Sequence, residues 1–148
     1  MLKSRLLIGF ISFLFFQYTH SQKRDEAVFF IQKDQINRFH TISELENLKK
    51  GDLIKIYQDR VREIMTVIPF LSLTNEPDVR LGDLGIKEDS DHIKSLKKSV
   101  EATQEAISTA ETSIEELVPY ADTEKIILTI LYFEEIIKKM RIGVNRSF

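Results

Sequence analysis

Apolar residues recur every three or four positions along residues 90–118 of the chain, without a slip in the spacing. The positions are Ile93, Leu96, Val100, Thr103, Ile107, Ala110, Ile114 and Leu117, of which Thr103 is polar. This alternation puts them on one side of an α-helix and is typical of helices that pack along a coiled-coil-like seam. Pro119 should end the helix, because a residue before proline is disfavoured in the helical region. The segment predicts one long amphipathic helix.

Two further segments carry the same spacing. In residues 53–71 the seam positions are Ile54, Tyr57, Val61, Ile64, Ile68 and Leu71. Additional apolar residues widen this stripe, which indicates a helix covered on more than one side. Pro69 predicts a kink near Met65 or an end soon after Leu71.

The last helix should begin at Asp122 or Thr123 and end near Gly143. Its seam positions are Ile126, Ile130, Phe133, Ile137 and Met140. Glu134–Lys138 and Glu135–Lys139 have the spacing of i,i+4 ion pairs, and we place both pairs on its outer side.

Together these segments predict an all-α fold, an antiparallel three-helix (up-down-up) bundle with coiled-coil-like seams. The tight turn at 118–121 favours an αα-hairpin of the last two helices. The connection 74–90 should pack back over the helices through Val79, Leu81, Leu84 and Ile86. With 5 glycines and 3 prolines in 148 residues, the turn residues of a sandwich or barrel are missing.

A short extra helix should precede the bundle. Ser43 and Glu46 have the capping-box form, and Gly51 would end that helix before Asp52 caps the next one. Residues 22–42 form a partly flexible lead-in, and the bundle domain spans 43–148. The apolar run 27–31 is either a short strand or the start of a helix, and we expect it to dock on the helices or on a partner.

The first residues have the three parts of a cleaved signal peptide. Lys3 and Arg5 precede an apolar run from Leu6 to Phe16, and small residues at Thr19 and Ser21 follow it. The run is too short to span a membrane, so no stable span is expected after cleavage. The junction at Ser21 resembles those of exported proteins of Gram-negative bacteria. We expect residues 1–21 to be removed and the protein to be periplasmic or extracellular.

Composition and motifs argue against several functions. The formal net charge is −2, which offers no electrostatic footprint for nucleic acid, and the chain has no cysteine for disulfides or catalysis. Residues 88–92 combine acids with His92, but helix capping explains them without a metal. No nucleotide-binding, hydrolase or metalloprotease motif is present. We therefore expect no enzyme, cofactor or metal site.

One stretch of the long helix is built from small residues. Thr103, Ala106 and Ala110 would face large residues such as Phe133. Small side chains opposite large ones are the usual way in which the layers of a helical bundle pack together. The alternative is a partly unfilled middle that holds an apolar ligand beside a few hydroxyl groups.

The sequence thus predicts an exported, non-enzymatic helical-bundle protein that acts by protein–protein interaction in the cell envelope. Its partner would be an unidentified envelope protein or a second copy of the chain. The alternative is a small periplasmic carrier or sensor that binds an apolar ligand inside the bundle.

Overall fold

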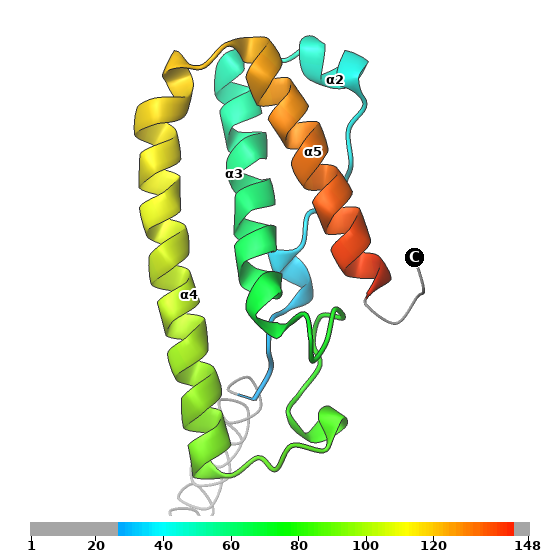
Figure 1. The fold of residues 1–148 in the computed structure, drawn as a ribbon, viewed down its shortest axis with the longest axis vertical. Coiled ribbons are helices and arrows are strands. Elements are labelled where there is room, and N and C mark those ends of the chain that lie inside the picture. The colour runs from blue at the N-terminus through cyan, green and yellow to red at the C-terminus, as the bar shows by residue number, and fades with distance from the viewer. Residues whose placement is uncertain (1–26, 144–148) are drawn as a thin grey trace, which may run out of the picture.

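A computed structural model describes residues 27–143 of the chain. The expected signal peptide and its cleavage site lie outside these residues. The described part is all-α, as the sequence predicts, and its three long helices run in alternating directions, which are down, up and down in the view of Figure 1. They are α2 (Ile42–Glu46), α3 (Lys50–Val67), α4 (Ser90–Leu117) and α5 (Thr123–Ile142). The 3₁₀ helix η1 (Gln32–Asp34) precedes them, and three more lie between them: η2 (Ile68–Phe70), η3 (Gly82–Leu84) and η4 (Val118–Tyr120).

The three long helices form a layer with α3 in the middle. α3 packs against both α4 and α5, whereas α4 and α5 barely touch each other (Figure 1). The expected αα-hairpin of α4 and α5 is therefore wrong. Pro119 lies in η4, and Ala121 after it is extended, so the chain crosses to the far side of α3 before α5 begins. The wide apolar stripe of α3 accommodates neighbours on both sides.

The prolines and caps end the helices close to their predicted bounds. α3 gives way at Val67 to η2, which contains Pro69, and Asp89 caps α4 by accepting a hydrogen bond from the His92 amide. The Asp89 side chain also lies 2.9 Å from the His92 ring, so these two residues serve the helix start.

The expected capping box at Ser43 is wrong, because Thr41 caps α2. The Glu44 carboxylate accepts a hydrogen bond from the Thr41 amide at 2.8 Å, which is the main reason that the pKa of Glu44 is lowered to about 2. Gly51 lies in the first turn of α3 and does not end a helix. Both Thr41 and Ser43 have a glutamate three residues later, so the capping pattern alone could not distinguish them.

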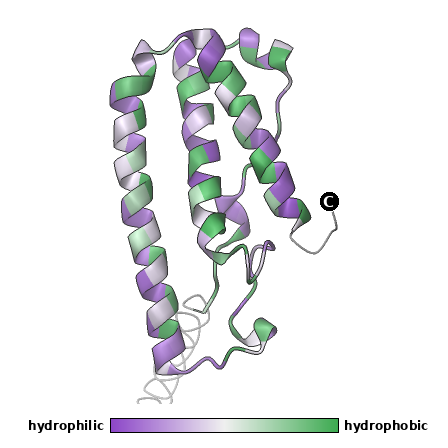
Figure 2. Ribbon diagram, in the orientation of Figure 1, coloured by the Kyte–Doolittle hydropathy of each residue, from purple (hydrophilic) through white to green (hydrophobic). Residues whose placement is uncertain are grey.

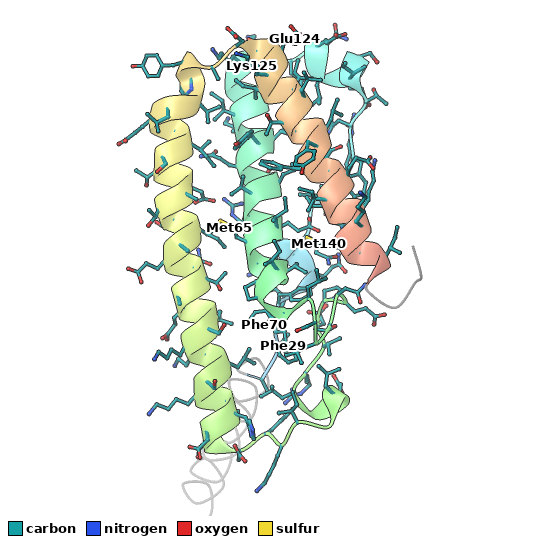
Figure 3. All side chains as sticks on the ribbon, in the orientation of Figure 1. Phe29, Met65, Phe70, Glu124, Lys125 and Met140 are labelled. Atoms are coloured by element: carbon teal, nitrogen blue, oxygen red, sulfur yellow. The ribbon has the colours of Figure 1, made fainter. Side chains whose placement is uncertain are left out.

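Residues 27–40, which we call the strap, run across one side of the layer. In the view of Figure 1 the strap passes behind α3 and α5. Its apolar start is buried, as expected: Ala27, Phe29 and Phe30 are at most 4% exposed. The rings of Phe29 and Phe70 lie 5.3 Å apart at the lower end of α3 (Figure 3).

The strap is neither a regular strand nor an α-helix. Hydrogen bonds join it to the connection after η2: Phe29 donates to Val79 and Leu81 donates to Ala27. Leu81 is buried, and Val79 and Ile86 pack on the same cluster as Phe29, as the sequence predicts. Leu84 is an exception, since it is 39% exposed.

The predicted seams hold on α5 and hold in part on α4. On α5 four seam residues are buried, namely Ile126, Ile130, Ile137 and Met140. On α4 the buried residues are Leu96, Ile107 and Ile114, but Val100 and Leu117 are exposed. The middle of α4 is pale in Figure 2 because alanine, serine and threonine dominate it.

On α3 the predicted seam is not the buried side. Its buried residues are Leu53, Arg60, Glu63 and Val67, whereas the predicted seam residues are half-buried or exposed. The strap and α5 cover these four buried residues. The predicted seam residues remain only partly covered, and most of them belong to the surface described below.

Candidate functional site

Two ion pairs cross between α3 and α5 beneath the strap. Arg60 of α3 bonds Glu134 of α5 at 2.7 Å, and Arg141 of α5 bonds Glu63 of α3 at 2.9 Å. Three of these side chains are almost fully buried, with Arg60 4%, Glu63 0% and Glu134 1% exposed. We call these four residues the clamp. Buried charges persist only where partners compensate the loss of water, and here each has one.

The clamp holds the backbone of the strap at alternate residues. The Ile36 amide donates to Glu63 at 2.6 Å, and the Ile36 carbonyl accepts from Arg141 at 2.8 Å. Arg60 donates to the Arg38 carbonyl at 2.9 Å, and the His40 amide donates to Glu134 at 2.7 Å. Because these bonds go to backbone groups, they fix an extended path without requiring particular strap side chains.

Glu134 is the centre of this network. Its Oε1 lies 3.0 Å from Nδ1 of His40 and also accepts from Arg60. Burial by itself would raise the pKa of Glu134, but hydrogen bonds from His40 and Arg60 outweigh it and lower the pKa below its ordinary value. Glu134 is therefore a carboxylate at neutral pH.

The structure corrects the expected outer position of Glu134. Lys138 pairs with Glu135, and it also lies 5.1 Å from the Phe39 ring of the strap. The spacing contained a signal for this, because Glu134 follows Ile130 by four positions and precedes Ile137 by three. A glutamate in a seam position indicates a buried partner.

The clamp has the properties of a structural network. Among the described residues no buried side-chain nitrogen or oxygen lacks a hydrogen-bond partner, and no three potential ligands are grouped to hold a metal ion. The carboxylates are occupied by arginines and strap amides. The arrangement fixes the strap over the layer.

The opposite side of α3 from the strap has a second apolar stripe. Helical geometry puts six residues along it: Ile54, Tyr57, Val61, Ile64, Met65 and Ile68. Five are half-buried and Ile68 is 54% exposed. Met65 points from α3 toward α4 (Figure 3).

The flanking helices continue this surface on both sides. On α4, Val100, Gln104 and Ile107 lie toward the strap, so the other side carries Ala106, Ala110, Ser113 and Leu117. On α5, Glu134 and Arg141 lie toward the strap, and the other side carries Thr129, Tyr132, Phe133 and Ile136. The Phe133 ring meets the Tyr57 ring of α3 at 5.2 Å.

We call this three-helix surface the open face. The residues named above are uncharged, and Lys125 and Lys139 lie beside them on the same side of α5. Tyr132 is 65% and Leu117 68% exposed. Groups of exposed apolar residues mark interaction surfaces more often than isolated ones do.

A cavity of about 220 Å³ lies on the strap side, between the strap, α3 and α4. Its walls include Phe29, Phe30, Phe70 and Ile107, with Thr103 among the polar groups. Ala106 is exposed, and Ala110 and Phe133 are half-buried on the open face. Of the four residues singled out from the sequence, Thr103 alone lines this cavity.

Within residues 27–143 no helix is long and apolar enough to cross a membrane. Comparison of the chain with known protein families, characterised proteins and solved structures finds no match. The functional assignment therefore rests on this chain's own residues.

Proposed function

We propose that this chain is an exported, non-enzymatic helical protein that binds another protein chain in the cell envelope through the open face. The observation that carries the proposal is the open face itself, a surface of largely apolar residues on three helices, of which Ile68, Leu117 and Tyr132 are exposed. Binding would remove this surface from water, and the apolar area buried would stabilise the complex.

Export is supported by the sequence of residues 1–21, in which a basic start, a short apolar run and small residues occur in the order of a signal peptide. The partner would then be met in the periplasm or outside the cell. An exported chain without cysteine depends on packing and buried ion pairs, such as the clamp, to remain folded in that compartment.

A photo-reactive phenylalanine analogue placed at Ile68, at the end of the α3 stripe in the open face, should form a covalent protein adduct on illumination of whole cells. Ile68 is 54% exposed, so the substitution should leave the fold intact. The matched control is Ile42, which is 50% exposed but lies on α2, away from this surface. Adducts are read as shifted bands on denaturing gels and identified by mass spectrometry. Absence of adducts at Ile68, or equal labelling at Ile42, would overturn the proposal.

A second candidate function is a carrier of a small apolar molecule, and the cavity beside Thr103 favours it. Its volume suits a ligand far smaller than a membrane lipid, and its walls are mainly aromatic and aliphatic. Native mass spectrometry of protein purified from its own cells distinguishes the two. A bound small molecule that is lost when Thr103 is replaced by leucine would favour the carrier.

A further inference from the structure

We propose that the cavity on the strap side binds a neutral small molecule built on an aromatic ring and carrying one or two hydrogen-bonding groups. The inference rests on the second candidate function above, and it names the chemical class of the ligand. The cavity lies between the strap, α3 and α4. The open face is on the other side of α3, so the two sites are separate.

Aromatic and aliphatic side chains form most of the cavity wall. Seven of the twelve lining residues are apolar, and three of these are the phenylalanines Phe29, Phe30 and Phe70. The three rings are at most 6% exposed, and those of Phe29 and Phe70 lie 5.3 Å apart (Figure 3). An apolar cavity of about 150 Å³ takes up benzene, so a cavity of about 220 Å³ holds one ring system with a substituent.

Two threonine hydroxyls supply polar groups to this apolar cavity. Thr66 of α3 and Thr103 of α4 line it and are half-buried, and within residues 27–143 neither side chain forms a hydrogen bond. By contrast, the hydroxyls of Thr109 and Thr112 of α4 each donate to a carbonyl of their own helix at 3.0 Å. A hydroxyl both donates and accepts, so Thr66 and Thr103 can bond to an N–H, hydroxyl or carbonyl group of a ligand.

The pairing of α3 with α4 sets the levels of the two hydroxyls. Arg62 of α3 pairs with Glu111 of α4. Because the two helices are antiparallel, Thr66 lies about one helical turn beyond this pair, and Thr103 lies about two turns beyond it in the same direction. The hydroxyls are therefore on facing helices and about 5.4 Å apart along the helix axes. A ring system that lies along the helices would have a hydroxyl within reach at each end.

The charged residues around the cavity favour a neutral ligand. Among the described residues that line it, Arg62 is the only cation, and Glu111 and Asp59 already engage its guanidinium group. Asp34 is the only anion, and it accepts a hydrogen bond from the Ile31 amide at 3.1 Å. A carboxylate or phosphate would find no free cation here, and any charged group would lose hydration against the apolar wall.

Titration of the purified protein with indole, followed by two-dimensional NMR, tests the site. Indole has two fused rings and one N–H group. It should shift the backbone amide signals of Thr66, Thr103 and Ile107 in a saturable manner, because these residues line the cavity. Benzoate, an aromatic anion, should leave these signals unchanged. Failure of indole to bind, or equal shifts with benzoate, overturns the proposal.

The double variant Thr66→Val/Thr103→Val removes both hydroxyls and keeps the shape of the side chains. It should raise the dissociation constant for indole by about threefold to tenfold, the usual effect of losing a hydrogen bond, with an unchanged circular-dichroism spectrum. Thr109→Val/Thr112→Val is the matched control, because these threonines lie outside the cavity and bond to their own helix. Equal affinities of the two double variants would overturn the proposal.

The outcomes separate this inference from the proposed functions. A charged molecule found bound to the native protein disproves the ligand class and leaves the carrier function in place. Absence of both a bound molecule and indole uptake disproves the carrier function as well. Photo-adducts at Ile68 report on the open face alone, so protein binding is tested independently of both results.

Discussion

Replacing Glu134 with glutamine should lower the free energy of unfolding by about 3–5 kcal/mol at pH 7, the usual result of removing one partner from a buried ion pair. Arg60, 4% exposed, would keep its charge in the interior without a carboxylate. In the wild-type protein His40 donates a hydrogen bond to one carboxylate oxygen of Glu134, and Arg60 donates to the other. The NH₂ group of glutamine would replace one of these acceptors with a donor. Urea denaturation followed by circular dichroism measures the change.

Glu135 provides a control on the same helix. Its side chain is 61% exposed and pairs only with Lys138, so Glu135→Gln should change the free energy of unfolding by less than about 0.5 kcal/mol. Similar losses for the two variants would contradict the clamp.

The same carboxylate makes stability depend on pH. The pKa of Glu134 is lower in the folded chain than its ordinary value of 4.5, so the unfolded chain binds the proton more tightly. The stabilisation is complete above pH 4.5 and is lost as the pH falls further through the folded pKa. Glu134→Gln should lose less stability than the wild-type protein over this range, because its side chain no longer titrates.

Replacing Ile130 with aspartate should lower the free energy of unfolding by more than about 3 kcal/mol, because an unpaired charge would enter the core. Ile130 is 0% exposed and packs with Leu45, Leu53 and Ile126 where α2, α3 and α5 meet. Ionisation of the new carboxylate would require water to enter this cluster.

Leu128 receives the same substitution as a control. It lies two residues away on α5 but is 51% exposed, so Leu128→Asp should cost less than about 1 kcal/mol. Chemical denaturation gives both values. Equal losses at the two positions would show that α5 presents a different side to the core.

Local rules located the helices well. Pro69 and Pro119 marked the ends of α3 and α4, and the spacing of Ile126, Ile130 and Ile137 gave the buried side of α5. Each of these features depends on residues close together in the sequence. Backbone geometry and the helical repeat are sufficient to predict them.

Features that depend on distant residues were not predictable in the same way. The seam spacing of α3 identified a side with Val61 and Ile68 that is apolar but only partly covered. The strap covers a different side of α3. It is held by hydrogen bonds from the backbone amides of Ile36 and His40, which the pattern of side chains in the sequence does not reveal. The sequence pattern predicted that Glu134 pairs with Lys138 on its own helix. In the structure Glu134 pairs with Arg60 of α3 instead.

Export is the premise of a binding partner in the cell envelope, and the intact mass of the native protein tests it most directly. The protein purified from its own cells should begin at Gln22, so its mass should be that of the full chain less residues 1–21, with allowance for cyclisation of the new terminal glutamine. It should be recovered from the periplasmic or extracellular fraction. A protein that retains Met1 in the cytoplasmic fraction would contradict the account.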